Sequence, residues 1–365
     1  MNYNNEQEYI SIEDLVNNKK SDNSNSPKNP KKPKKKKKVF LKVFLVILAL
    51  IIIMIGLFGY GYAQFLLNKI PTSDPTNPDS NVSVVTPDFN SEKVVNILLI
   101  GVDKRTDDDI GRSDSMILLS VDGKTKQLKM TSFMRDLYVP LADDYGSNRL
   151  NAAFAFGGPD LLVKTISENF DVQIDAYAWV DFKNFIKIID ILGGIEMDVK
   201  EEEISNMNEH MYYINSDLEK PREDAFVTES GLQLLDGRQS LAYSRVRYTA
   251  GGDFQRTQRQ RTVIEKVIAK AKKSNIFTLN NLAIEVLPMV NTNLSKNSIA
   301  ELALSISKIT NYETSQFRIP VDDLYYEDNI NEMSVLVPDN LEDNADALHE
   351  FLDSPVPIKK PDDDD

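Results

Sequence analysis

The chain of 365 residues contains no cysteine and only two histidines, His210 and His349, which are isolated from each other in the sequence. Without cysteine, neither a disulfide framework nor a thiolate metal site can form. Two isolated histidines also argue against a histidine-based metal cluster and a Ser-His-Asp triad. The sequence has no internal repeat, and its 41% of apolar residues is enough for a hydrophobic core. The chemistry is therefore sought among carboxylates and arginines.

Positive charge is scarce overall but concentrated at the N-terminus. The chain has 42 Lys and Arg against 56 Asp and Glu, a formal net charge of -14. Up to residue 42 the charge is about +6, which leaves roughly -20 for the remainder; such asymmetry indicates a partner or a membrane orientation. Residues 1–38, which end in KNPKKPKKKKK, are expected to be a disordered, lysine-rich cytoplasmic segment.

A long uncharged run follows these lysines: VFLVILALIIIMIGLFGYGYA, residues 43–63. At ~1.5 Å per residue it spans the ~30 Å hydrocarbon core of a bilayer. The lysines that precede it predict a cytoplasmic N-terminus, and no small-residue cleavage site follows. We therefore expect an uncleaved transmembrane helix within 39–67, a single-pass protein of the cell membrane, and an extracellular globular part. The lysine block then serves topology and anionic lipid rather than nucleic acid.

The remainder divides into a linker, a domain and a tail. Residues 68–93 are rich in Pro, Ser, Asn and Asp and predict an extracytoplasmic linker, and residues 351–365 predict a disordered acidic tail. Between them, 94–350 alternate between apolar strands and amphipathic helices, which predicts an α/β domain with a mixed central sheet and helices on both faces. The expected helices begin at Pro159 and Phe182 and then run near 232–248, 254–273, 279–288 and 296–309.

Arginine is concentrated in YSRVRYTAGGDFQRTQRQR, residues 243–261, which holds five of the chain's twelve arginines. Asp253 is a suitable N-cap for a helix that begins at Phe254. One stripe of that helix carries Arg256, Gln260, Val263, Ile264 and Val267. Because its apolar members must face the core, Arg256 and Gln260 point the same way, with Arg259 beside them. Arg245 and Arg247 are two residues apart and project to one side of an extended stretch.

A buried guanidinium needs an anion, because its burial without a partner costs several kcal/mol. Internal pairs with carboxylates are one solution in so acidic a chain. Nucleic acid fits poorly, since counterion-release binding requires a basic surface. A compact, multiply charged phosphate ligand fits best, because the guanidinium fork matches phosphate oxygens.

A second charged cluster, IGVDKRTDDDIGRSDS, follows the first expected strand, where α/β proteins bind ligands. It offers Asp103, Arg105, Arg112 and Asp114, whereas 107–109 fit an ordinary polar loop. Carboxylates beside a phosphate site commonly hold Mg²⁺, which prefers oxygen ligands. Arg135 and Asp136, in SFMRD, end another strand.

Six blocks now stand in the order of a known family: NILLIGVD, GRSDSMILLSVD, SFMRDLYVP, NAAFAFGGP, LDGRQSLAYSRVRY and GGDFQRTQRQR. The chain resembles the LytR-CpsA-Psr (LCP) family, and the resemblance implies an LCP-type domain. It also implies a phosphotransferase at the outer face of a Gram-positive-type cell. Such an enzyme moves a glycopolymer, of teichoic acid or capsule type, from an undecaprenyl-pyrophosphate carrier to a peptidoglycan sugar hydroxyl and forms a phosphodiester.

The resemblance also implies roles for individual residues. Asp103 and Asp114 are the expected ligands of Mg²⁺ (or Mn²⁺). The expected catalytic residues are Asp103, Arg112, Arg135, Arg245, Arg247 and Asp253. The expected pyrophosphate-binding residues are Arg105, Arg149, Arg256, Arg259 and Gln260, with Arg149 at a position where the family often has lysine.

The polyprenyl tail of such a donor needs shelter from water, at ~0.8 kcal/mol per buried CH₂. We expect an apolar tunnel between sheet and helices, with Phe154, Phe156 and Phe185 as candidate lining residues that fit a plain core equally well. Two alternatives stay open. One is a polyprenyl-pyrophosphate hydrolase that uses the same site with water as acceptor. The other is a non-catalytic regulatory or binding protein of the cell envelope.

Overall fold

A computed structural model describes residues 93–104, 109–247, 252–309 and 311–355, together with the single positions 61, 65, 68 and 87. The predicted lysine-rich segment lies outside the described residues, as do 356–365 and, apart from those single positions and Lys93, the predicted anchor and linker. Among the helices that the structure describes, none combines the length and the apolar character needed to cross a membrane.

The centre of the domain is one six-stranded sheet with the order β10-β3-β2-β1-β6-β9. β1 is antiparallel to β2, β2 to β3 and β6 to β9, whereas β1 and β6, and β3 and β10, run parallel. The predicted mixed sheet is therefore confirmed. The strands are β1 (Val94–Asp103), β2 (Arg112–Asp122), β3 (Gln127–Phe133), β6 (Ala176–Asp181), β9 (Asn291–Thr292) and β10 (Glu313–Ile319).

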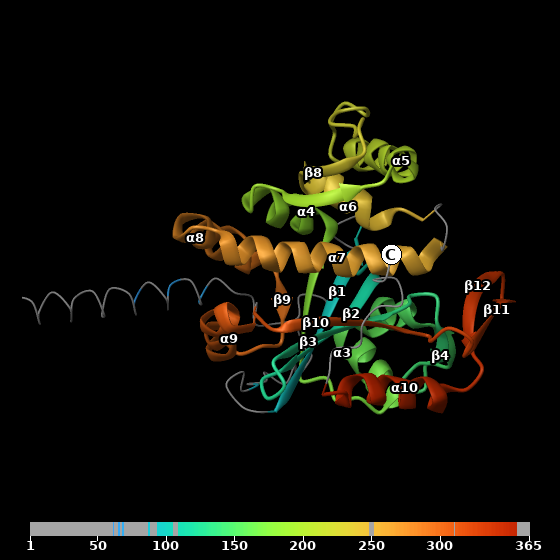
Figure 1. Ribbon diagram of the computed structural model, residues 1–365. Helices are drawn as coiled ribbons and strands as arrows, with labels where there is room; N and C mark the ends of the chain where they lie inside the picture. Colours follow the sequence, from blue (N-terminus) through green and yellow to red (C-terminus); the bar gives the residue numbers. More distant parts are fainter. Residues whose placement is uncertain are drawn as a thin grey trace, which may run out of the picture. The chain divides into compact units, whose positions relative to one another are not determined.

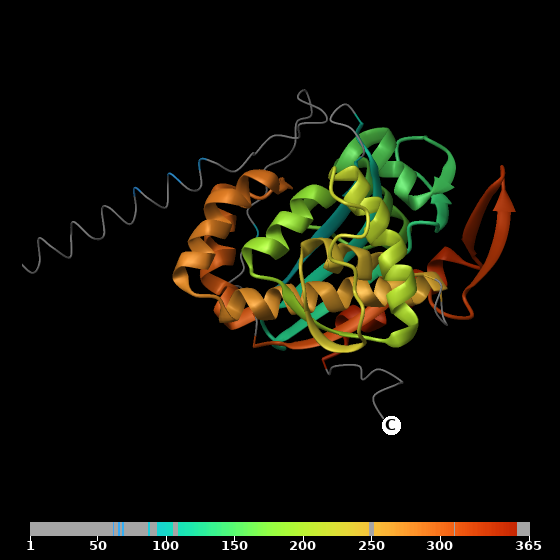
Figure 2. The ribbon, with the colours of Figure 1, turned by 90° about the horizontal axis from the view of Figure 1, so that it is seen from above.

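Helices cover both faces of this sheet (Figures 1 and 2). Alternate residues of β1 point to opposite faces, so Leu98 and Ile100 pack with α3 (Leu150–Phe170) and α10 (Leu341–Asp353) in the largest apolar cluster. Val95 and Ile97 pack on the other face with residues of α9 (Lys296–Ile309). That face is also covered by α4 (Phe182–Ile191) and α7 (Gly252–Lys273). A strand buried on both sides explains why its sequence is apolar at nearly every position up to Ile100, with Asn96 as the polar exception.

Smaller elements surround the sheet. Two-stranded sheets are formed by β4 (Tyr138–Pro140) with β5 (Ser147–Arg149), β7 (Ile195–Val199) with β8 (Gly231–Leu235), and β11 (Tyr325–Ile330) with β12 (Met333–Pro338). The remaining helices are α5 (Glu201–Asp217), α6 (Gly237–Arg245), α8 (Ile276–Glu285) and the 3-10 turn η1 (Leu287–Met289).

Three predicted boundaries are wrong. The helix expected near 232–248 is strand β8 followed by α6, because residues 231–235 pair with β7 and Asp236 starts a new helix with a capping box to Gln239. The helix expected to begin at Pro159 begins at Leu150 and is kinked at Gly157 and Gly158, so Pro159 opens only its second segment.

The third boundary is the end of the domain. The tail predicted from residue 351 begins later, because α10 runs to Asp353 and Phe351 is buried. The buried Lys129 of β3 donates through Nζ to the carbonyl oxygens of Leu352 and Ser354, at 2.5 and 2.7 Å. A cation at a helix C-terminus is favourable, and this contact fixes the end of α10 to the central sheet.

Candidate functional site

Two cavities lie on either side of Asp114, near the end of β1 and the beginning of β2. One has a volume of about 660 Å³ and a mainly apolar wall, and the other, of about 630 Å³, is lined mainly by charged residues. Asp114 lines both of them. Of the residues predicted from sequence, Asp103, Arg112, Asp114, Arg135 and Arg149 line the charged cavity, whereas Arg245, Arg247, Arg256 and Gln260 line the apolar one beside Asp114.

The geometry of the charged cavity starts with the turn between β1 and β2. Asp103 and Arg112 are paired across the two strands, just past an irregularity in the register at Gly101 and Val102. Gly111 precedes Arg112 with φ +82°, and a Cβ there would lie 2.6 Å from the carbonyl oxygen of Asp103. Only glycine fits so close an approach at positive φ. The turn therefore brings a carboxylate and a guanidinium to the same rim.

Charges of opposite sign alternate along the wall of this cavity. Arg135 Nη1 lies 2.7 Å from Asp114 Oδ1, and its Nε lies 3.4 Å from Asp136 Oδ2. Arg149 Nε lies 3.6 Å from Asp136 Oδ1, and Arg149 also donates through Nη2 to the carbonyl oxygen of Ser334 at 2.6 Å. These contacts orient Arg135 and Arg149, whose side chains keep about a fifth of their surface exposed.

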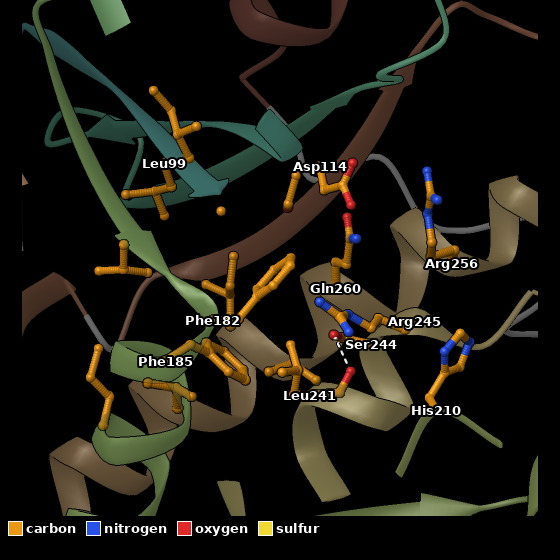
Figure 3. Close-up of a pocket in the computed structure, with 18 of the residues that line it drawn as sticks. Leu99, Asp114, Phe182, Phe185, His210, Leu241, Ser244, Arg245, Arg256 and Gln260 are labelled. Atoms are coloured by element: carbon orange, nitrogen blue, oxygen red, sulfur yellow. Dashed lines mark hydrogen bonds between the residues drawn. The ribbon is translucent and has the colours of Figure 1, made fainter. Parts of the chain in front are cut away.

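The apolar cavity lies between the sheet and the helices of its second face (Figure 3). β1, β2 and β6 contribute Leu99, Leu119 and Ala178, and α4 contributes Phe182 and Phe185. The predicted stripe of α7 is confirmed, because all five of its residues line this cavity: Arg256, Gln260, Val263, Ile264 and Val267. Figure 3 shows Gln260 pointing toward Asp114. Polar residues thus come from the first turns of α7 and apolar ones from the turns that follow.

The three phenylalanines predicted to line a tunnel lie in different parts of the structure. Phe185 lines the apolar cavity. Phe154 is wholly buried in the core on the opposite face of the sheet, against Trp179, and Phe156 is exposed at the surface. Phe185 therefore lies where a lining residue was expected, and Phe154 follows the plain-core alternative because α3 packs on the face of the sheet away from the cavity. Both expectations are wrong for Phe156.

Arg245 is the best-defined cation of the apolar cavity. Its guanidinium lies over the ring of Phe182, 4.0 Å from the centroid, a cation–π arrangement. Burial lowers the pKa of Arg245, and the nearby charges of Asp103 and Asp114 act in the opposite direction. A buried cation of this kind is stabilised by negative charge, and an anionic ligand next to Asp114 would supply more of it.

Arg259 differs from the other predicted site residues. It is 5% exposed, its Nε lies 2.7 Å from Oε1 of Glu203, and it donates to the carbonyl oxygen of Val246 and the side chain of Gln255. It lines neither of the two cavities described above. The structure thus places Arg259 in an internal ion pair and not with the other candidates. Arg105 lies outside the described residues, and Asp253 lies in the first turn of α7, which begins two residues earlier than predicted.

Helix α5 adds residues that the sequence did not suggest. Glu209, His210 and Tyr213 line the apolar cavity at the end where Arg245 and Arg247 lie. Burial and the charges of these two arginines lower the pKa of His210, whereas Glu209 raises it. The sequence holds no signal for this contribution, because an isolated histidine has no spacing partner and α5 was not predicted.

Fold and site together define a class: an α/β protein whose candidate site has an arginine- and carboxylate-lined end and an apolar end. The chain belongs to the LytR_cpsA_psr family, whose sequence model matches residues 60–349. This confirms the resemblance drawn from the six blocks.

Known relatives agree with this assignment. The regulatory protein MsrR of Staphylococcus aureus (strain COL) is 30% identical over 71% of this chain and 74% of its own. A polyisoprenyl-teichoic acid–peptidoglycan teichoic acid transferase, TagU of Bacillus cereus (strain AH820), is 31% identical over 69% of this chain and 78% of its own. Among solved structures, TagT bound to LIIa-WTA superposes with a TM-score of 0.58 at 25% identity, over 78% of this chain and all of that one.

Proposed function

We propose that this chain is a membrane-anchored, extracytoplasmic phosphotransferase. It moves a glycopolymer of teichoic acid or capsule type from an undecaprenyl-pyrophosphate carrier to a peptidoglycan sugar hydroxyl, and forms a phosphodiester. The observation that carries this proposal is that Asp114 lines both the charged and the apolar cavity, because the proposed donor also joins a charged diphosphate to an apolar chain. The named activity of TagU and the ligand of TagT, LIIa-WTA, support it.

The apolar cavity supports a prenyl chain as the lipid part of the donor. Each isoprene unit has five carbons, so its transfer from water into an apolar site is favourable by about 4 kcal/mol at ~0.8 kcal/mol per carbon group. Phe182, Phe185, Leu241 and Val267 supply apolar side chains on several sides of the cavity. Such a chain would place its diphosphate at the Asp114 end, where the polar residues of the cavity gather.

The arginines at that end support a transferred phosphate. Phosphoryl transfer depends mainly on positioning and on neutralising charge, which arginines aimed at the phosphate oxygens provide. Arg112, Arg135 and Arg149 approach from the charged cavity, whereas Arg245, Arg247 and Arg256 approach from the apolar one. The two sets together would hold both phosphates of the donor and stabilise the departing polyprenyl phosphate.

Two carboxylates fit the proposed Mg²⁺ (or Mn²⁺). Asp103 and Asp114 line the same charged cavity, and the described residues form no cage of three or more His, Asp or Glu. Mg²⁺ is usually held by one or two carboxylates together with ligand phosphates, which matches this set. Asp103 and Asp114 would hold the ion, and it would supply charge neutralisation at the phosphate oxygens.

The test is a transfer assay with the full chain in phospholipid vesicles, a prenyl-pyrophosphate-linked glycan as donor and uncrosslinked peptidoglycan as acceptor. Polymer attached to peptidoglycan is the expected product, and Asp114→Asn and Arg245→Ala should reduce its formation at least a hundredfold. Leu234→Ala, at an exposed position of β8 in the two-stranded sheet with β7, is the control.

The assay also separates the alternatives. Release of free polymer phosphate regardless of acceptor would identify a hydrolase. Absence of any product with the wild-type chain, while relatives are active under the same conditions, would favour a regulatory or binding role and overturn the proposal.

A further inference from the structure

Two aromatic rings are stacked on each other at the surface beside the charged cavity. Tyr145 is 52% exposed and Phe156 is 48% exposed, and their ring centroids lie 5.8 Å apart with an interplanar angle of 15°. Large aromatic side chains usually bury most of their surface in the core, and an exposed apolar patch often marks a binding surface. This pair is therefore a candidate binding surface.

The pair borders the candidate site. Phe156 follows Ala155 directly, and Ala155, Asn151 and Arg149 line the charged cavity. Since successive Cα atoms lie ~3.8 Å apart, the aromatic pair begins one residue away from the cavity wall. The kink of α3 at Gly157 and Gly158 ends the helical turn directly after Phe156.

Hydrogen bonds and an ion pair hold the loop that carries Tyr145 in place. Tyr145 lies in the loop between β4 and β5, which closes with a hydrogen bond from Leu141 N to the carbonyl oxygen of Gly146, at 2.9 Å. Ala142 N donates to Thr165 Oγ1 of α3 at 3.1 Å, and Lys164 of α3 pairs with Asp143. A preformed surface of this kind loses little conformational entropy when a ligand binds.

We propose that Tyr145 and Phe156 form a stacking platform for a pyranose ring of the acceptor glycan. The proposal rests on the proposed function and adds a sugar subsite to it. A pyranose presents C–H groups on its faces and hydroxyls on its edge, so it suits an apolar ring bordered by hydrogen-bond acceptors. Asp143 and Asp144, both exposed, precede Tyr145 in the loop and supply carboxylate oxygens of that kind.

Charge favours an uncharged acceptor sugar over two other occupants. A phosphate-rich polymer and an anionic bilayer would both be repelled by the carboxylates of this loop, where Lys164 pairs with Asp143 and Asp144 adds a further negative charge. A neutral saccharide is not repelled by these carboxylates. The platform would hold the acceptor while the arginines and carboxylates of the neighbouring cavity hold the donor phosphates.

The experiment compares Tyr145→Ala, Phe156→Ala and the double variant in the full chain with Tyr145→Phe, which keeps the ring, and with Leu234→Ala, an exposed apolar control. Chitotetraose is the probe for uncharged sugar binding, and its Kd is measured by NMR titration. The transfer assay then gives KM for the peptidoglycan acceptor and for the lipid-linked donor. Tm is recorded for every variant.

The double variant should raise the Kd for chitotetraose and the acceptor KM roughly tenfold, the size of effect expected for a lost aromatic contact. The donor KM, kcat and Tm should stay near wild type, and Tyr145→Phe should behave as wild type. An unchanged Kd and acceptor KM, a lower Tm alone, a raised donor KM, or loss of binding to phosphatidylglycerol vesicles alone would each overturn the platform. Failure of wild-type transfer would count against the proposed function, whereas probe binding that depends on both rings would still support the platform.

Discussion

Removal of the Glu203 carboxylate should destabilise the domain strongly. Glu203 is 2% exposed, accepts from Arg259 Nε at 2.7 Å and also accepts from the backbone N–H of Lys200 at 2.9 Å, where α5 begins. Glu203→Ala removes the carboxylate partner of the buried Arg259 cation, whose hydrogen bonds to the Val246 carbonyl oxygen and the Gln255 side chain are made to neutral groups. Breaking a buried pair on one side typically costs about 3–5 kcal/mol. At ~2–4 °C per kcal/mol for a domain of this size, Tm should fall by roughly 6–20 °C.

Urea unfolding, followed by circular dichroism, measures this loss directly, and Arg259→Ala should give a comparable one. The matched control is Asp143→Asn, which breaks the exposed pair with Lys164 and should leave stability close to that of the wild type. A double variant of Glu203 and Arg259 gives the coupling energy of the pair. A loss below about 1 kcal/mol for Glu203→Ala would refute the reasoning. So would an Arg259→Ala variant that keeps full stability but loses transfer, since this would return Arg259 to the phosphate site.

Three further predictions concern the site itself. Gly111→Ala should cost about 1–3 kcal/mol and most of the transfer activity, because its Cβ would approach the Asp103 carbonyl at positive φ; urea unfolding and the transfer assay check this. Because the fold lowers the pKa of His210, the unfolded chain takes up a proton there more readily as the pH falls below about 6.5, and the free energy of unfolding decreases. His210→Gln should therefore lose less stability than the wild type between about pH 7.5 and 5.5, and equal losses in the two proteins would contradict this account. Ala178→Leu should fill the apolar cavity and weaken binding of long prenyl pyrophosphates more than that of short ones; calorimetry with both chain lengths tests this, and equal weakening would speak against a tail site.

Periodicity predicted the parts of the site that lie on one regular element. The α7 stripe needs only the 3.6-residue period and the rule that apolar side chains face the core, and all five of its residues line the apolar cavity. The first strand beside the charged cavity was likewise predictable, because β1 is mainly apolar and Asp103 stands at its end. The spacing of apolar residues along the sequence was enough to predict both the α7 stripe and strand β1.

Long-range partners could not be predicted in this way. Arg259 lies three residues after Arg256 on the same helix, yet its carboxylate partner stands 56 residues away on α5. Nothing in the spacing separates an arginine that meets Glu203 from one that lines a cavity. His210 was missed for a similar reason, since its importance comes from the arginines that tertiary structure places beside it.

Propensity also failed where pairing decides the structure. Residues 231–235 read as the start of a helix, but they pair antiparallel with β7, and the true helix starts after Asp236. The cross-strand partner outweighs the local preference of such a short segment. The end of α10 was misjudged because the contact that fixes it comes from Lys129, more than 220 residues earlier.

The division of labour along α7 has a consequence for how such proteins diversify. Arg256 and Gln260 belong to the half of the helix near the charged groups, and Val267 and Ile268 belong to the half that lines the apolar part of the cavity. If the proposed function holds, a descendant can adapt to a shorter or bulkier hydrocarbon by exchanging Val267 and Ile268, about two turns away from Gln260. The proposed lipid and diphosphate sites could then evolve at different rates on one helix.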